Sequence, residues 1–574
     1  MMKKIVLAAV NAKYIHANLA VYSLKSYAEN VNTEEKEGVS IEIAEYTINQ
    51  QEDLILEDLY RRKPAVLCFS CYIWNIRMIG ELLPEIAKIC AETEIWLGGP
   101  EVSYDAVRVL EQFPQVRGVM KGEGEETFLA LTQKWSRKEE ELSDTDGITY
   151  RDQNGTVQEN PWRQPVHMDR IPFVYQDMTD FEHKILYYES SRGCPFSCSY
   201  CLSSVDKRLR FRSLELVTEE LQFFLDRRVP QVKFVDRTFN CRHEHAVAIW
   251  TYLAEHDNGV TNFHFEISAD LLNEEEIRLI RSMRPGLIQL EIGVQSTNPD
   301  TIRAIQRTMD LKKLSLAVEK IREKHNVHQH LDLIAGLPWE DLRSFARSYD
   351  WIYQLRPDQL QLGFLKVLKG SRMAQMQEEY QILHKDAPPY EVLSTRWISY
   401  ADLLVMKGVE EMTELYYNSG QFRTSLALLE TCCTSPFLMF RQLADFYGEK
   451  GLHFLSHSRA SRYEILLEFT QETYPALGEE MRDRLIYDYY LRENAKSRPS
   501  FAGPDRTDRE RVRAFYEREA EDPFYLKGYE EYDKNQIRRM THMEYFPSCG
   551  RYVVFDYLKR DPLTHDGQGI LIEK

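Results

Sequence analysis

The chain has 574 residues, which is too long for one hydrophobic core and predicts about three or four domains. Hydrophobic residues make up 43% and charged residues 28%, and the 33 Tyr, 26 Phe and 8 Trp supply ample core material, which excludes general disorder. The formal net charge of −18 disfavours extended contact with nucleic acid, and without a run of about 18 apolar residues no membrane span is expected.

Residues 1–136 alternate short apolar runs with amphipathic stretches. The first run, Ile5–Val10, is too short for the core of a signal peptide and predicts a buried strand instead. The alternation predicts a doubly wound, Rossmann-like parallel sheet. The five expected strands are Ile5–Val10, Ile41–Tyr46, Ala65–Ser70, Ile95–Leu97 and Val116–Met120.

Residues 137–180 are polar and turn-rich, which predicts a linker, and Asn154-Gly155 within them predicts a hairpin. Over residues 181–375 the alternation resumes with six strand–helix units. Because a full eight-unit barrel takes about 250 residues, six units predict a partial (β/α)6 barrel of the TIM type, with a continued doubly wound sheet as the alternative. The expected strands are Ile185–Glu189, Val232–Asp236, Phe263–Ile267, Leu287–Ile292, His328–Ile334 and Gln359–Val367.

Residues 376–574 change in character. Helical periodicity dominates, which predicts a mostly α-helical C-terminal domain, with a loop near Ala495–Glu510 and one late strand at Tyr552–Tyr557. No chemical motif stands out in this region, so the sequence assigns it no role.

Three cysteines, Cys194, Cys198 and Cys201, stand four and three residues apart. One loop that carries three thiolates can wrap a corner of a cuboidal iron–sulfur cluster. A four-iron cluster normally has four Cys ligands, so three leave one iron open to another ligand. A structural zinc ion is the alternative. It needs a fourth donor, and His243 or His245 could supply one, although neither stands at a recognisable zinc spacing.

The triplet resembles the Cys-x3-Cys-x2-Cys signature of the radical S-adenosylmethionine (SAM) enzymes, including the preceding Arg192-Gly193 and the aromatic Tyr200. The resemblance implies a [4Fe–4S] cluster on Cys194, Cys198 and Cys201, SAM at the open iron, and reductive cleavage of SAM to a 5′-deoxyadenosyl radical. It implies that Tyr200 lies against the adenine. It also implies a cytoplasmic protein with flavodoxin or ferredoxin as its electron donor.

Polar residues follow the expected barrel strands, at the edge where ligands collect in such folds. The resemblance implies that Asp236 contacts the methionine amino group, although the common Gly-Gly-Glu form is absent. A structural interpretation stands beside this one: Asp236 could cap a helix or pair with Arg237, and Gln295 and Gly336 could serve turns. The residues assigned to SAM are Tyr200, Asp236, Ser268, Glu291, Gln295 and Gly336.

Residues 1–136 resemble the cobalamin-binding domain of a large radical SAM subgroup. Glycines such as Gly98 and Gly99 let the backbone approach a bulky planar ligand. The Asp-x-His-x-x-Gly motif, which supplies a histidine ligand to cobalt in other cobalamin-binding proteins, is absent. His16 is therefore expected to be a polar loop residue. The residues assigned to cobalamin are Ser70, Gly98, Gly99 and Glu123.

Together the resemblances imply a cobalamin-dependent radical SAM enzyme for methyl transfer or rearrangement on a small biosynthetic substrate. One alternative is a methylthiotransferase-like enzyme that modifies RNA or protein. Such enzymes carry three further cysteines in the first domain, whereas Cys68, Cys71 and Cys90 do not match that arrangement. The other alternative is a sensor or binding protein with a structural metal cluster, which would not cleave SAM.

Overall fold

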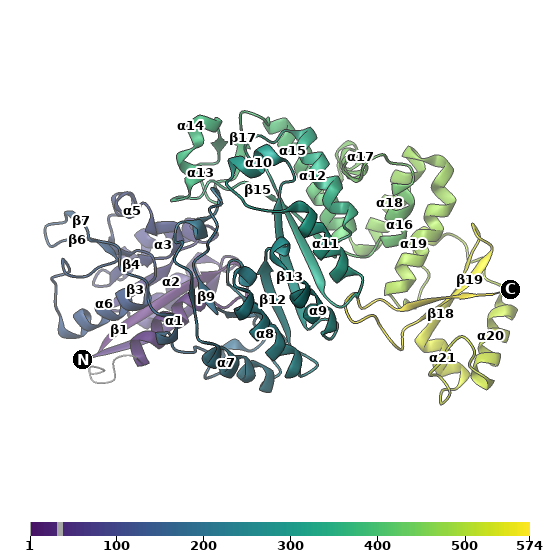
Figure 1. The fold of residues 1–574 in the computed structure, drawn as a ribbon, viewed down its shortest axis with the longest axis horizontal. Helices are drawn as coiled ribbons and strands as arrows, with labels where there is room; N and C mark the ends of the chain where they lie inside the picture. Colours follow the sequence, from purple (N-terminus) through teal and green to yellow (C-terminus); the bar gives the residue numbers. More distant parts are fainter. Residues whose placement is uncertain (1, 31–37, 574) are drawn as a thin grey trace.

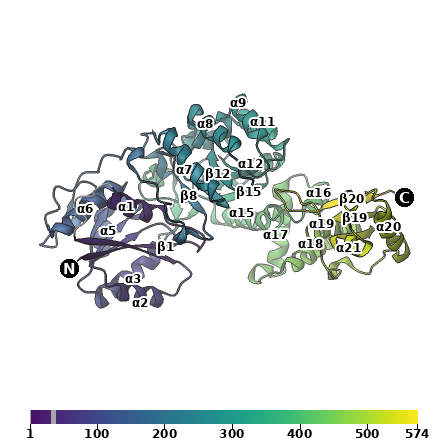
Figure 2. The same ribbon diagram turned by 90° about the horizontal axis from the view of Figure 1, so that it is seen from below.

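The computed structural model describes residues 2–30 and 38–573. Three parts follow one another along the longest axis: an N-terminal α/β part, a central barrel-like part and a C-terminal part (Figures 1 and 2). Within the described residues, no helix is both long and apolar enough to span a bilayer.

The first part is a seven-stranded sheet in the order β2-β1-β3-β4-β5-β6-β7, in which the first five strands are parallel. Strand β1 shows why both faces of this sheet are covered by helices, because its alternate residues are apolar on both sides. Its residues Ile5, Leu7 and Ala9 pack into one hydrophobic cluster, and Val6, Ala8 and Val10 into another. The doubly wound prediction is therefore confirmed. The strands are β1 (Lys3–Asn11), β2 (Val39–Thr47), β3 (Val66–Ser70), β4 (Glu94–Gly98), β5 (Val116–Met120), β6 (Ile148–Arg151) and β7 (Val157–Glu159), and the main helices are α1 (Leu19–Asn30), α2 (Glu52–Arg62), α3 (Ile76–Ile89), α5 (Ala106–Gln112) and α6 (Glu125–Arg137).

The expected hairpin around Asn154-Gly155 forms, but it does more than join two domains. Its strands β6 and β7 extend the first sheet, because β6 pairs antiparallel with β5. Part of the predicted linker thus belongs structurally to the first sheet.

The central part is a six-stranded parallel sheet in the order β15-β14-β13-β12-β11-β8. The order follows the chain without reversing, as in an open barrel, so the partial barrel is confirmed and the continued doubly wound alternative is wrong. The strands are β8 (Leu186–Tyr188), β11 (Gln231–Phe234), β12 (Asn262–Ile267), β13 (Ile288–Gln295), β14 (His328–Ala335) and β15 (Gln359–Phe364), and the covering helices are α7 (Leu214–Asp226), α8 (His243–Glu255), α9 (Glu274–Ser282), α11 (Leu311–Arg322) and α12 (Leu342–Gln354).

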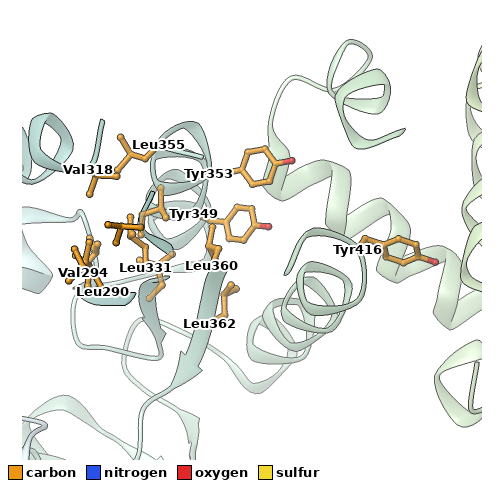
Figure 3. Packing of buried hydrophobic residues seen from close by; sticks show 14 of the residues in the cluster. Leu290, Val294, Val318, Leu331, Tyr349, Tyr353, Leu355, Leu360, Leu362 and Tyr416 are labelled. Carbon is orange, nitrogen blue, oxygen red and sulfur yellow. The ribbon is translucent and has the colours of Figure 1, made fainter. Parts of the chain in front are cut away.

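Alternation along the barrel strands separates an apolar outer face from a polar inner face. On β13 the side chains of Leu290 and Val294 are fully buried with those of neighbouring strands, whereas Glu291 lies on the other face. Figure 3 shows the leucines and valines gathered together, with Tyr349 and Tyr353 pointing away from them. The inside of the barrel therefore carries charged and polar groups.

The third part joins the barrel through α12. Tyr349 lies 2.8 Å from Thr413 through their hydroxyls, and Tyr353 donates to Glu430 at 2.6 Å. The helices are α15 (Tyr400–Met412), α16 (Arg423–Glu430), α17 (Pro436–Glu449), α18 (Arg459–Thr473), α19 (Gly478–Arg492), α20 (Arg509–Glu521) and α21 (Lys534–Met540), and an antiparallel sheet of β18 (Thr541–Phe546), β19 (Arg551–Asp556) and β20 (Gln568–Ile572) closes the chain. The helical prediction is confirmed; β19 is the late strand, and its two partners were not predicted.

Candidate functional site

A cavity of about 1180 Å³ lies where the carboxyl edge of the first sheet meets the start of the barrel. Sites for drug-sized ligands usually measure about 300–1,000 Å³, so this one suits a larger molecule. Ser70, Gly98, Gly99 and Glu123, which the sequence assigns to cobalamin, all lie in its wall. His16, expected to be a polar loop residue, also lines the cavity.

The cavity wall on the first-domain side includes glycines from two loops, Gly98 and Gly99 at the end of β4 and Gly122 and Gly124 after β5. Gly99 has φ of 108°, and a Cβ there would lie 2.5 Å from the carbonyl oxygen of Cys71, so only glycine fits this turn. Ser103 donates to the carbonyl of Gly99 at 2.8 Å and accepts from the amide of Gly122 at 3.2 Å. These two bonds join the loops after β4 and β5. The size of the cavity and the glycine turn in its wall fit a corrinoid.

The cysteine loop supplies the opposite wall, through Arg192 and Gly193. Cys194 and Cys198 are buried and Cys201 is half-buried. Burial raises the pKa of the Cys194 thiol, and the charges of Cys201 and Cys198 raise it further. Three thiolates that each bind a separate iron match a four-iron cluster with one open iron.

The predicted zinc alternative lacks its fourth donor. His243 Nδ1 lies 3.0 Å from Glu276 Oε1, and His245 Nε2 lies 3.0 Å from Ser190 Oγ. Both histidines are therefore engaged away from the cysteines. In the described part of the chain, no three Cys, His, Asp or Glu side chains converge as a site for one metal ion.

Beside Cys198 the structure gathers two residues assigned to SAM, Tyr200 and Gln295, around Arg307. Arg307 Nη1 lies 3.7 Å from Cys198 Sγ and 3.5 Å from the Tyr200 hydroxyl, and its Nη2 donates to the Gly293 carbonyl. Gln295 Oε1 and Arg307 Nε are buried without a hydrogen-bond partner among the described residues. An unpaired acceptor and an unpaired donor next to the cysteine loop fit a polar ligand such as SAM. Sequence reasoning missed Arg307, because no motif marks it.

Other residues assigned to SAM have partners within the protein. Asp236 is fully buried and accepts from the Ser190 amide at 3.0 Å and from the Ser190 and Ser191 hydroxyls at 2.6 Å. Ser268 donates to Asp270 at 2.7 Å. The partners of Asp236 are thus two serines that lead into the cysteine loop, and not the helix end or Arg237 that the structural interpretation expected.

Gly336 also serves the backbone. Its φ is 84°, and a Cβ there would lie 2.6 Å from a methyl group of Val392. The turn at Gly336 is thus covered by a segment from beyond the barrel.

The inner face of the barrel carries a charged group around Glu291. His264 Nε2 lies 2.8 Å and Lys233 Nζ 3.1 Å from Glu291 Oε2. Although burial acts to raise the pKa of Glu291, His264 and Lys233 together lower it to about 2. Neighbouring Glu266 has no hydrogen-bond or ion-pair partner among the described residues, and burial raises its pKa to about 7 although the charge of Arg237 acts to lower it. The sequence marked Glu291 but gave no sign of His264 or Lys233.

Charged side chains join the two walls of the cavity. Arg192, directly before Gly193, lies 2.8 Å from Glu189, 2.5 Å from Glu125 and 3.3 Å from Glu123. Arg210 also donates to Glu123. Glu123 and Glu125 flank the entry to α6, so this network ties the first domain to the cysteine loop.

Three family profiles match the chain in succession. One described as "B12 binding domain" matches residues 5–132, one described as "Radical SAM superfamily" matches residues 188–352, and one described as "Protein of unknown function (DUF4080)" matches residues 378–562. The first two matches coincide with the two walls of the cavity.

Curated relatives are similar over part of their length. An uncharacterized methyltransferase of Pyrococcus horikoshii is 25% identical over 288 residues, which cover 48% of this chain and 61% of the relative. The cobalamin-dependent radical SAM methyltransferase TokK of Streptomyces tokunonensis is 26% identical over 306 residues, 49% of this chain and 44% of TokK. The matches therefore span about half the length of these relatives.

Two solved structures share the fold. The cobalamin-dependent SAM radical enzyme OxsB, solved with aqua-cobalamin and SAM bound, superposes with a TM-score of 0.60 at 16% identity, over 85% of this chain and 79% of OxsB. The radical SAM methyltransferase TsrM of Kitasatospora setae, solved with cobalamin and a [4Fe-4S] cluster, gives 0.55 at 16% identity, over 68% of this chain and 76% of TsrM.

Proposed function

Because this chain belongs to the radical SAM enzymes that carry a B12-binding domain, we propose that it uses SAM and cobalamin to methylate a small biosynthetic substrate. When bound, a [4Fe-4S] cluster supplies the electron that cleaves SAM to a 5′-deoxyadenosyl radical, and cobalamin supplies the methyl group. The names of two curated relatives as methyltransferases support methyl transfer over rearrangement. A reduced flavodoxin or ferredoxin in the cytoplasm is the proposed electron source.

One observation carries the proposal: a single cavity is lined both by Gly98 and Gly99 of the first domain and by Arg192 and Gly193 of the cysteine loop. A ligand in this cavity contacts both cofactor-binding segments at once. Methyl transfer needs this proximity, because the reacting groups must be held close together in one site.

The chain's own residues would bind and orient the reactants. Cys194, Cys198 and Cys201 would hold the cluster. Arg307 Nε would donate to an acceptor of SAM, and Gln295 Oε1 would accept from one of its donors, since both atoms are buried without partners among the described residues. Glu266, with a pKa of about 7, can hold or release a proton inside the barrel near neutral pH.

The methylthiotransferase alternative is poorly supported. Cys68 and Cys71 are buried at the carboxyl end of β3, whereas Cys90 follows α3, a helix of 14 residues that spans about 21 Å. Three cysteines so distributed would not bind one second cluster.

The test is anaerobic reconstitution of the full chain with iron, sulfide and hydroxocobalamin, followed by reduction with flavodoxin and addition of SAM. We expect the absorption bands of both cofactors and formation of 5′-deoxyadenosine. Cys198→Ala should abolish 5′-deoxyadenosine formation, whereas Cys432→Ala, an exposed cysteine far along the chain, should leave it unchanged. A fully loaded wild-type protein that forms no 5′-deoxyadenosine would favour the sensor alternative.

A further inference from the structure

A segment beyond the barrel, residues 366–392, contacts both walls of the cavity; we call it the bridging segment. It leaves the end of β15 and returns to it, because the Val367 amide donates to the Tyr390 carbonyl at 3.0 Å and the Val392 amide to the Leu365 carbonyl at 2.9 Å. Its first helix, α13 (Arg372–Gln375), lies at the junction of the first domain and the barrel (Figure 1). Its later residues fall within the match to the family of unknown function, which begins at residue 378.

The first helix of the bridging segment supports the cysteine loop. The Met373 amide donates to the carbonyl of Ser199 at 2.7 Å. Ser199 is fully buried between Cys198 and Cys201, and its own amide donates to the Ile305 carbonyl at 2.9 Å. The segment therefore fixes the backbone between two of the three cysteines.

Lys369 and Tyr390, near the two ends of the segment, hold the helix that follows the Gly98-Gly99 turn, α4 (Pro100–Ser103). Tyr390 donates to Glu101 through its hydroxyl, and Lys369 Nζ lies 3.2 Å from Glu101 and 3.3 Å from Asp105. Glu101 is only 3% exposed. A carboxylate buried this deeply needs both partners, because an unpaired buried charge is costly.

Between these contacts the segment lies directly behind the cavity wall. Gly370 has φ of 80°, and a Cβ there would lie 2.3 Å from the ring of Tyr104. Tyr104 lines the cavity. The backbone of the bridging segment therefore packs against a side chain that faces the ligand space.

We propose that the bridging segment sets the spacing between the cysteine loop and the corrinoid wall, with Tyr390 and Lys369 as positioning residues. This inference rests on the proposed function. It assigns a role to the start of the family of unknown function: the region after the barrel completes the cofactor site by anchoring α4. The anchored carboxylate, Glu101, stands two residues after the glycine turn that the corrinoid would contact.

The test is titration of the full-length, cluster-loaded protein with hydroxocobalamin, followed by absorption. Tyr390→Phe and Lys369→Met should each weaken hydroxocobalamin binding about tenfold, because each removes a partner of a buried carboxylate. Iron content should stay at the wild-type level. The matched control is Lys385→Met in the same segment, because Lys385 pairs with Glu391 and not with α4.

Two further measurements separate positioning from general stability. Lys369→Arg keeps the charge and should bind within about twofold of wild type. The double variant of Tyr390→Phe with Glu101→Gln should lose less affinity than the two single losses combined, since both remove the same bond. If Tyr390→Phe and Lys369→Met both bound hydroxocobalamin with wild-type affinity, this inference would be overturned but the proposed function would not. Failure of the wild-type protein to bind hydroxocobalamin would overturn the proposed function as well.

Discussion

Individual buried groups explain much of the chemistry of this site. Arg307 and Gln295 each keep an atom without a partner beside the cysteine loop, whereas Glu291 is held by His264 and Lys233. Buried polar atoms in folded proteins almost always have partners, so these two exceptions beside the cysteine loop fit a ligand bound there.

Glu266 should make stability depend on pH. Its pKa is raised from 4.5 to about 7 by burial, so the folded protein binds the proton more tightly than the unfolded chain. The stabilisation of the folded protein by this tightly bound proton is complete below pH 4.5 and is lost as the pH rises through about 7. Relative to Glu266→Gln, the wild type should lose on the order of 3 kcal/mol between those values. Denaturant unfolding of both proteins at several pH values measures it; parallel pH profiles would contradict the raised pKa.

Among the secondary-structure elements, the cysteine loop depends on a buried carboxylate that binds the two serines directly before the loop. Asp236, at the end of β11, accepts three hydrogen bonds from Ser190 and Ser191. Asp236→Asn keeps the size of the side chain but removes one charged acceptor, and we expect the cluster to be lost about tenfold faster. Iron release to a chelator, followed under anaerobic conditions, measures this rate. Asp300→Asn on the exposed helix surface is the control, and equal rates would show that Asp236 does not support the loop.

Periodicity and strand-end rules could predict the elements and the edge at which the site lies. They could not predict which side chains at that edge remain free. Asp236 and Gly336 stand at the correct strand ends, yet one bonds to serines and the other makes room for Val392. Arg307 and Tyr390 could not be predicted, because only the tertiary fold brings Arg307 beside Cys198 and Tyr390 to Glu101 from distant parts of the chain.

At the scale of the whole molecule, Arg192 joins two domains by binding carboxylates from both. Arg192→Lys keeps the charge but cannot contact Glu189, Glu123 and Glu125 together, because lysine lacks the planar fork. We expect amide hydrogen exchange in the Gly122–Glu125 turn to become about tenfold faster, as local opening becomes easier. Mass spectrometry of deuterated peptides measures this. Arg303→Lys on an exposed helix is the control, and unchanged exchange at the turn would show that the domains are held by other contacts.

The hairpin of β6 and β7 determines where the first domain can be truncated for expression as a separate fragment. A fragment that stops at residue 136 would strip β5 of its antiparallel neighbour and leave an open sheet edge, which invites aggregation. A boundary placed after Glu159 keeps the edge covered by the chain's own strands.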